Sequence, residues 1–363
     1  MTASVSAPPA FAPATPAPSA ALTIEACSTA HGAQWNEYLT RRPEGSYYHL
    51  FEWQQINQQA LGHRTAYLLA RDGATVRGVL PLTFVSSPLF GRILCSLPFV
   101  NYGGPIADDE IAKDALVKAA QNTAKEWRAD YLELRCADQL QTDMPVSTRK
   151  ISMHIALDPD PDVLWNKFSS KHRTNIRRSQ KNELVVTAGG SELLETFYSV
   201  MEQSWRQLGT PLYKRSYFES ILRALPDHTR IFVCARGTEP VAVAFNGYFN
   251  GTVEGLWAGG TELSRPLQAN YALYWEMIRE ACVRGCTRYH LGRSTADSGA
   301  EDFKKKWNAT SSQLYWYFHR PNGGEMPQLN VDNPKYKLAI DLWRRLPLWT
   351  TRIIGPPLAR LIP

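Results

Sequence analysis

The same succession of hydrophobic and polar patterns occurs twice along the chain. Apolar residues at alternate positions predict strands, and apolar residues spaced by three or four predict helices. In the first half these patterns cover residues 23–27, 31–42, 51–61, 63–85, 91–104, 109–128 and 131–136. In the second half they cover residues 184–188, 191–208, 215–225, 229–249, 253–260, 270–284 and 289–293. This order predicts an α/β fold in which helices flank mixed, largely antiparallel sheets.

Short motifs recur between the two halves at nearly constant spacing. The matching pairs are residues 70–71 with 235–236, Tyr102 with Trp257, and residues 131–135 with 289–293. Their offsets lie between 155 residues (102 to 257) and 165 residues (70 to 235). Such a spacing predicts a duplicated fold with loop differences, with one domain over residues 23–150 and a second over residues 151–330.

The two ends of the chain depart from this plan. Residues 1–22 are rich in Pro and Ala and contain no Lys, no Arg and no continuous apolar run, which predicts a disordered tail and not a signal peptide. Residues 331–363 form an apolar, basic and amphipathic segment without an acid after Asp341. No stretch of about 18 uninterrupted apolar residues occurs, so a transmembrane helix is not expected.

Composition limits the kinds of protein that the chain can form. With 363 residues, of which 44% are hydrophobic, the chain is long enough for two domains with their own cores. A formal charge of +6 is too small to indicate a nucleic-acid-binding protein by itself. The Cys residues form no CxxC pair and the His residues show no ligand spacing. We therefore expect neither a metal site nor a disulfide framework, and a reducing cytoplasm fits this chain.

Residues 165–181 carry the most concentrated charge, with six Lys or Arg and no acid. At about 100° per residue, a helix places the cations on one side and Leu164, Phe168 and Ile176 on the other. Guanidinium groups match phosphate oxygens, so we expect a cationic ridge that points into a crevice between the two halves and binds phosphate. The substrate-binding candidates on this ridge are Lys171, Arg173, Arg177 and Arg178. The alternative is an ordinary solvated basic helix.

Three consecutive lysines lie between Phe303 and Trp307 in a short predicted helix. If the two aromatic side chains anchor this helix, Lys304 can hold a developing oxyanion or a phosphate, and it is the catalytic candidate. Trp307 is a substrate-binding candidate beside it. The alternative is that the aromatic residues anchor the helix and leave all three lysines in water.

Further substrate-binding candidates surround the predicted cleft of the second half. Glu254 and Trp257 share a strand and are expected to face this cleft, although Trp257 also fits a core position and Glu254 a solvent-facing one. Arg293 lies at the end of the last predicted strand. Asn270 and Tyr274 open the crossover helix, and helix N-termini attract anions.

These motifs together resemble a known family. The repeated plan, the Arg-x-x-Ile-Arg-Arg motif at 173–178, the Gly-Arg-Ser strand end at 292–294 and the Phe-Lys-x-x-Trp motif look like FemAB-type aminoacyltransferases. These are tandem members of the GNAT superfamily with a BioF2-like acetyltransferase domain. The resemblance covers residues 23–355 and is strongest to the branch associated with PEP-CTERM/exosortase systems and exopolysaccharide loci.

The resemblance implies a function and roles for particular residues. It implies transfer of an acyl group, in the Fem enzymes an amino acid from aminoacyl-tRNA, to an amine on a lipid-linked or nucleotide-linked precursor of peptidoglycan or exopolysaccharide. Lys304 matches the family's transition-state lysine. Asp108, in the Gly-Pro-x-x-Asp element at 104–108, matches the residue that positions or deprotonates the amine. Asn308 stands where many relatives have Gly.

The acyl donor stays open between aminoacyl-tRNA and acyl-CoA, and no further cofactor is required. The helical arm of the staphylococcal-type enzymes is missing, which disfavours tRNA. The loop before residue 270 lacks the glycines that hold acetyl-CoA in ordinary N-acetyltransferases. The oligomeric state also stays open.

The composition of residues 336–363 indicates where in the cell the protein acts. Tryptophans 343 and 349 accompany arginines 344, 345, 352 and 360, a composition that suits the interface of a membrane. We therefore expect a cytoplasmic protein with a peripheral contact at the inner face of the membrane. An ordinary helix docked on the second domain is the alternative. Two rival functions remain: an acyl-CoA-dependent N-acyltransferase and a non-catalytic membrane-surface assembly factor for polysaccharide export.

Overall fold

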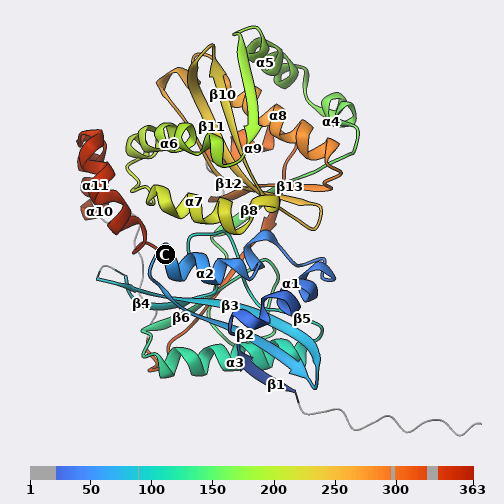
Figure 1. Cartoon of the computed structure of the whole chain (residues 1–363), viewed down its shortest axis with the longest axis vertical. Helices are drawn as coiled ribbons and strands as arrows, with labels where there is room; N and C mark the ends of the chain where they lie inside the picture. Colours follow the sequence, from blue (N-terminus) through green and yellow to red (C-terminus); the bar gives the residue numbers. More distant parts are fainter. Residues whose placement is uncertain (1–21, 89, 296–298, 325–333) are drawn as a thin grey trace, which may run out of the picture.

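The computed structural model describes residues 22–88, 90–295, 299–324 and 334–363. The tail predicted over residues 1–22 therefore lies, apart from Leu22, outside the described residues. Two lobes stack end to end, and each has a mixed sheet with helices on its faces (Figure 1). The predicted α/β class and the duplicated plan are both confirmed.

The sheet of the first lobe has the strand order β1-β2-β3-β4-β6-β15-β7, with β5 beside β3. Its strands are β1 (Thr23–Ala26), β2 (Arg64–Asp72), β3 (Thr75–Ser87), β4 (Gly91–Cys95), β5 (Ile106–Ala107), β6 (Tyr131–Cys136), β7 (Val146–Ser147) and β15 (Tyr315–His319). Its helices are α1 (Gly32–Thr40), α2 (Glu52–Gln59) and α3 (Glu110–Glu126), with short 3-10 turns at Thr29–His31 and Tyr47–His49.

The sheet of the second lobe has the order β14-β8-β13-β12-β11-β10-β9. Its strands are β8 (Lys150–Ala156), β9 (Leu184–Gly189), β10 (Thr229–Arg236), β11 (Glu239–Phe249), β12 (Thr252–Gly260), β13 (Arg288–Thr295) and β14 (Thr310–Gln313). The remaining helices are α4 (Pro161–Lys167), α5 (Ser170–Gln180), α6 (Leu194–Leu208), α7 (Arg215–Ala224), α8 (Ala269–Val283), α9 (Gly299–Lys305), α10 (Pro334–Arg345) and α11 (Leu348–Ala359).

The two sheets share one topological feature. In the described residues each sheet has a single parallel pair, β4 with β6 and β12 with β13, and all other neighbours are antiparallel. A parallel pair needs a crossover connection, which α3 supplies in the first lobe and α8 in the second. The long helices predicted at 109–128 and 270–284 are these two crossovers.

One strand lies in a different lobe from the one predicted. Residues 315–319 fall inside the predicted second domain, yet β15 pairs antiparallel with β6 and β7 of the first sheet. Its sequence, YWYFH, suits a buried strand in either lobe, because alternation identifies a strand without identifying its partner. The second domain therefore ends before Tyr315, and the chain returns to the first lobe.

The lobes are held together by a shared aromatic core. One apolar cluster runs from Trp35 and Tyr47 in the first lobe to Phe218 and Trp257 in the second. The Tyr47 hydroxyl hydrogen-bonds the hydroxyl of Thr229 across the junction at 3.0 Å. Helices α2 and α7 face each other at this junction (Figure 1). The two lobes therefore share one continuous buried core.

Gly247 in β11 provides a test of this junction. A Cβ atom at Gly247 would lie 2.5 Å from the Tyr47 ring, so Gly247→Ala must displace that ring. We expect the free energy of unfolding to fall by about 1–3 kcal/mol in urea denaturation, the usual cost of overpacking. Gly299→Ala is the matched control, because a Cβ there meets no atom within 4 Å. Equal stability of the two variants would contradict a tightly packed junction.

Candidate active site

A cavity opens in the second lobe where two parallel strands diverge. Strands β12 and β13 pair only over Thr252–Glu254 and Arg288–His290, and beyond these residues their facing edges separate. The cavity has a volume of about 300 Å³. Its walls are Asn101 from the first lobe, Ala244 and Asn246 of β11, residues 255–258 of β12, Tyr274 and Met277 of α8, and Tyr289 and residues 291–293 of β13.

Local irregularities in both strands cause the divergence. In β12 the register against β11 shifts between Trp257 and Gly255, so Leu256 is an extra residue that bends the strand. In β13 the register against β8 shifts between His290 and Arg293, and Gly292 has φ of +77°. A side chain is disfavoured at such a φ, so this position requires glycine. The Gly-Arg-Ser motif seen in the sequence is the bent end of β13.

The corresponding opening in the first lobe is closed by the chain itself. Beyond the short parallel pairing of β4 with β6, the Ser96 amide donates to the carbonyl of Glu133 at 2.9 Å. The Arg135 amide donates to the Ser96 hydroxyl at 2.8 Å, and the Gly103 amide to the Arg135 carbonyl at 2.9 Å. The loop after β4 thus occupies the gap, and only the second copy keeps an open cleft of this type in the described residues.

Lys304 lies beneath the bent end of β13. Its ammonium donates to the carbonyls of Gly292 at 2.9 Å and Arg293 at 2.8 Å, and to the hydroxyl of Ser294 at 2.9 Å. Burial, followed by the charge of Arg293, lowers the pKa of Lys304 to about 8. The alternative that all three lysines lie in water is wrong for Lys304, which is buried. Lys305 and Lys306 are exposed, and Lys305 pairs with Glu301 at 2.8 Å.

These contacts change the role expected of Lys304. An ammonium has three donors, and all three are used to hold β13. Direct donation to an oxyanion would require one of these bonds to open. In the state seen here Lys304 fixes the cavity wall and supplies a positive charge behind it.

Arg293 brings a second cation to the cavity wall. Its guanidinium lies over the ring of Trp316 in β15, 5.4 Å from the ring centre. Burial, followed by the charge of Arg135, lowers the pKa of Arg293 to about 10. No ion pair joins Arg293 to a carboxylate within the part of the chain that the structure describes. It is therefore a partly buried cation that an anionic group could neutralise.

Glu254 lies where the cavity meets the lobe junction and is fully buried. The Tyr102 hydroxyl of the first lobe donates to its carboxyl group. Asn101, on the cavity wall, donates to the Tyr48 hydroxyl at 2.8 Å, and the rings of Tyr48 and Tyr102 meet edge to face. Burial raises the pKa of Glu254 to about 8, although the two tyrosine hydroxyls act in the opposite direction. The carboxyl group is therefore mostly protonated at neutral pH.

Comparison with known proteins agrees with this geometry. Residues 167–305 match the family model described as an acetyltransferase (GNAT) domain. The matched residues lie in the second lobe, from the end of α4 to the end of α9. The chain is also 23% identical over 211 residues to the lipid II:glycine glycyltransferase of Staphylococcus aureus, over 52% of this chain and 49% of that protein. The chain thus spans about half the length of the curated relatives it matches.

Solved structures extend the likeness to both lobes. FemX superposes with a TM-score of 0.64 at 16% identity, over 88% of this chain and 100% of that one. A tandem GNAT protein from the clavulanic acid biosynthesis pathway superposes with a TM-score of 0.53 at 9% identity, over 84% of this chain and 100% of that one. These likenesses establish the tandem GNAT fold. The PEP-CTERM/exosortase association stays a prediction.

Of the three aromatic residues predicted at the cleft, two line the cavity and the third supports its wall. Trp257 and Tyr274 line the cavity, and Trp257 also packs on Phe218 and Phe245 of the core. The extra residue in β12 brings Trp257 back to the face of Glu254, since an odd separation would otherwise place them on opposite faces. Trp307 is fully buried and stacks on Tyr274 with ring centres 5.8 Å apart, so it supports the wall without lining it.

The predicted basic helix at 165–181 is two helices. α4 ends before Phe168, and the Ser169 hydroxyl caps α5 by accepting from the His172 amide at 3.2 Å. Phe168 and Ile176 are buried as predicted. The exposed cations include Lys171, Arg177 and Arg178. The apolar periodicity of residues 165–181 does not reveal the break between α4 and α5, because the buried residues of both helices fit one face of a continuous helix.

The location expected for the cationic ridge is wrong. Helix α5 lies at the end of the second lobe that is farthest from the first lobe, and none of its cations lines the cavity (Figure 1). Arg173 has a structural role: its guanidinium donates to the carbonyls of Asn166 at 3.2 Å and Phe168 at 3.0 Å and so caps α4. It is not exposed for a substrate.

Helix α5 instead borders the start of α8. The Asn175 amide donates to the Tyr271 hydroxyl at 3.2 Å, and the Asn182 amide to the Leu267 carbonyl at 2.8 Å. No side chain caps α8, whose N-cap Gln268 has φ of +56°. Asn270, predicted to bind substrate, is exposed here and accepts from the Ser264 hydroxyl at 3.3 Å. Polar side chains of α5 therefore contact the uncapped start of α8, one to two turns from Tyr274 in the cavity, whereas Arg177 lies over the Trp165 ring of α4, 5.3 Å from its centre.

The structure does not bring Asp108 to the GNAT cleft. Its carboxylate accepts from the Tyr38 hydroxyl at 2.9 Å and pairs with Arg42 at 3.1 Å and Arg77 at 3.0 Å. All these partners belong to the first lobe. Strand β5 pairs with the start of β3 and carries Asp108 to the hairpin end, away from the cavity wall. The sequence motif shows that Asp108 follows Gly104 and Pro105, but it does not show that β5 pairs with β3.

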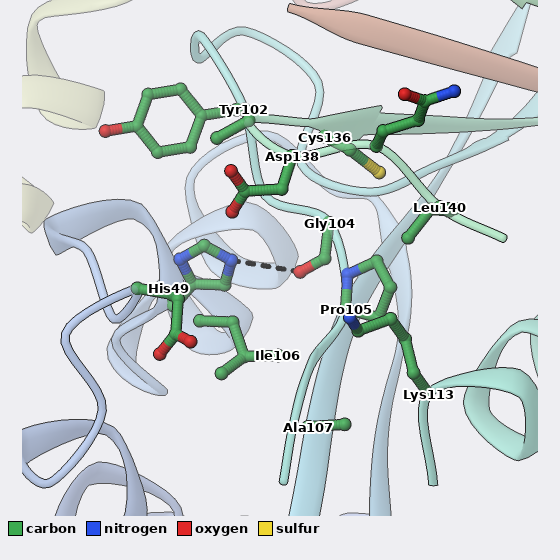
Figure 2. Close-up of a pocket in the computed structure, with 13 residues that line it drawn as sticks. His49, Tyr102, Gly104, Pro105, Ile106, Ala107, Lys113, Cys136, Asp138 and Leu140 are labelled. Carbon is green, nitrogen blue, oxygen red and sulfur yellow. Dashed lines mark hydrogen bonds between the residues drawn. The ribbon is translucent and has the colours of Figure 1, made fainter. Parts of the chain in front are cut away.

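The Gly-Pro element itself lines a smaller cavity in the first lobe. Figure 2 shows His49, Lys113 and Asp138 around this cavity of about 80 Å³. The His49 ring hydrogen-bonds the Gly104 carbonyl at 3.0 Å and the Ser46 hydroxyl at 2.8 Å. Burial lowers the pKa of His49 to about 4, so the ring is neutral and structural.

Sequence reasoning missed three first-lobe residues of the site. Asn101 and Tyr102 come from a loop of the first lobe and Tyr48 from its 3-10 turn, and they reach the second-lobe cleft only after the lobes dock. Tyr102 belongs to a repeated motif, but no sequence pattern indicates its contact with Glu254. Among the described residues, no group of three or more possible metal ligands gathers.

Glu254→Gln tests the raised pKa. The carboxyl group ionises near its ordinary value of 4.5 in the unfolded chain, but keeps its proton to about pH 8 when folded. Its contribution to the free energy of unfolding is therefore full below pH 4.5 and lost as the pH rises to 8. In urea denaturation, the free energy of unfolding of the wild type relative to that of Glu254→Gln should therefore fall between pH 5 and pH 8. Parallel curves would contradict a buried acid.

Proposed function

We propose that this protein is an acyltransferase that moves an aminoacyl or acyl group onto an amine of a phosphate-bearing, lipid- or nucleotide-linked precursor of the cell envelope or of an exopolysaccharide. The divergence of β12 from β13, backed by Lys304 and Arg293, is the observation that carries this proposal. The gap between the two strand edges can hold an elongated acyl donor. The likeness to the lipid II:glycine glycyltransferase of Staphylococcus aureus supports an amine acceptor on a lipid-linked precursor.

Attack of an amine on an activated acyl group makes few demands on a protein. The nucleophile must be positioned and deprotonated, and negative charge on the carbonyl oxygen must be stabilised. Arg293 and Lys304 provide a positive field at the cleft, where burial strengthens electrostatic interactions. Glu254 has a pKa near 8, so its ionised fraction, which grows as the pH rises toward 8, can accept a proton from an amine, and Tyr48 and Asn101 connect it to the cavity wall.

The basic end of α5 supports a phosphate-bearing donor. Helix α5, which carries the exposed Arg177 and Arg178, contacts the uncapped start of α8, and cations near a helix N-terminus favour phosphate. From there an extended donor would run along α8 to Tyr274 in the cavity. Both acyl-CoA and the end of an aminoacyl-tRNA carry phosphate in this way, so the two donors remain open.

Substitution of Lys304 tests the catalytic role of the cleft. Lys304→Met removes the positive charge and the three bonds that hold β13, and we expect the yield of acylated precursor to fall at least 100-fold, about 3 kcal/mol. Mass spectrometry of envelope precursors, from cells with and without the gene, measures this yield. The control is Lys306→Met on the exposed side of the same segment. An unchanged precursor profile with Lys304→Met at normal protein level would refute an enzymatic function.

The pH dependence gives a second readout for Lys304. Because its pKa is about 8, the ammonium loses its proton as the pH rises through this value. We expect turnover of the purified enzyme to decline above pH 8. Lys304→Arg should shift the decline to higher pH, since a guanidinium stays charged.

Charge reversal on α5 tests the donor site. Arg177→Glu with Arg178→Glu should weaken the binding of a pyrophosphate-containing ligand at least tenfold and flatten its dependence on salt. Lys125→Glu with Arg223→Glu, two exposed cations on other helices, is the matched control. Calorimetry with coenzyme A is the measurement. Strong binding of coenzyme A favours the acyl-CoA donor. If coenzyme A does not bind, the same variants are compared for their binding of tRNA.

A further inference from the structure

The C-terminal helices α10 and α11 carry an unusual concentration of exposed apolar side chains. Leu338 is 72% exposed, Leu342 61%, Trp349 66% and Ile353 65%. Ile354 and Leu358 are exposed beside them. Elsewhere in the described residues, large exposed apolar side chains such as Ile111 and Val283 are scattered over other helices and strands. Clustered exposure of this kind marks a contact surface, whereas single exposed residues do not.

The exposed residues form one face of a helix whose other face is buried. In α11, Thr351, Gly355 and Ala359 recur every fourth residue and are buried. Trp349 and Ile353 have the same spacing on the opposite side and are exposed. An α-helix brings every fourth residue to one side, so α11 has a small-residue face toward the protein and a bulky apolar face toward solvent.

The helices are fixed firmly to both lobes. The Arg352 guanidinium pairs with the buried carboxylate of Glu202 in α6, Nε to Oε1 at 2.7 Å. Arg206 of α6 donates to the Leu346 carbonyl at 3.2 Å. At the C-terminal end, His63 of the first lobe hydrogen-bonds the Arg360 carbonyl at 2.9 Å. Figure 1 shows α10 and α11 at the side of the molecule, where their outer face is accessible. The apolar face is thus held outward by specific contacts.

Charge identifies the kind of partner. No acidic residue occurs after Asp341, and Arg344, Arg345 and Arg360 are exposed in this segment. Arg344 pairs with Asp341 at 3.3 Å and Arg360 donates to the Leu61 carbonyl at 3.3 Å, so Arg345 is the exposed arginine closest to a free charge among these three. Arginine beside exposed Trp and Ile suits an interface with acyl chains in its interior and anionic headgroups at its edge. In the described residues no helix is long and apolar enough to cross a membrane. We propose that α10 and α11 dock the protein on the surface of a bilayer that contains anionic lipid. The proposal does not depend on the proposed function.

Vesicle co-sedimentation of the full-length protein tests this proposal. We expect binding to vesicles of phosphatidylcholine with 30% phosphatidylglycerol, weaker binding to phosphatidylcholine alone, and loss of this difference in high salt. Trp349→Ala with Ile353→Ala should reduce binding at least tenfold. The matched control is Ile111→Ala with Val283→Ala, which removes two equally exposed apolar side chains elsewhere. Arg344→Glu with Arg345→Glu should remove the preference for phosphatidylglycerol.

Two results would overturn the proposal. One is equal vesicle binding by the Trp349/Ile353 variant and its control. The other is a wild-type dimer in sedimentation velocity that the Trp349/Ile353 variant converts to a monomer, without vesicle binding, since the surface would then join two copies. The precursor assay with detergent-solubilised acceptor separates this test from the proposed function, because the docking variant should retain its turnover there.

Discussion

The short parallel pairing of β12 with β13 is the constraint on which the site depends. The strands share three residue pairs and then separate, because Leu256 is an extra residue and Gly292 has a conformation that side chains disfavour. The gap is stable only if other groups replace the lost sheet contacts. Lys304 does so for the carbonyls of Gly292 and Arg293, and Trp307 stacks behind Tyr274. Packing of α9 thus maintains a cavity that regular strand pairing would eliminate.

The two copies of the fold use the same opening differently. In the first lobe Ser96 and Gly103 fill it with main-chain contacts, and Arg135 is paired with Glu133. In the second lobe the gap stays open, and Arg293, the counterpart of Arg135, has no ion pair with a carboxylate in the described residues. The first lobe contributes from outside, through Asn101 and the tyrosines that contact Glu254. One lobe therefore completes the cleft of the other.

Burial is the first cause of every large pKa shift at the cleft. It lowers the pKa of Lys304 to about 8 and that of Arg293 to about 10, and raises that of Glu254 to about 8. At neutral pH the cleft combines two cations with a carboxyl group that is mostly neutral. Such an environment favours anionic groups and allows proton transfer at a pH where exposed carboxylates are weak bases.

The sequence by itself determined the element order, the duplication, the two crossover helices and the burial of residues such as Phe168 and Ile176, because these follow from local periodicity. It also identified Lys304, Arg293, Trp257 and Tyr274, which lie at or behind the cleft. Only the tertiary structure decided that β15 joins the first sheet, that α5 borders α8, that Asp108 pairs with arginines, and that Tyr102 reaches Glu254. Each of these depends on which distant segments pack together, and alternation of apolar residues gives a segment a buried face without specifying its partner.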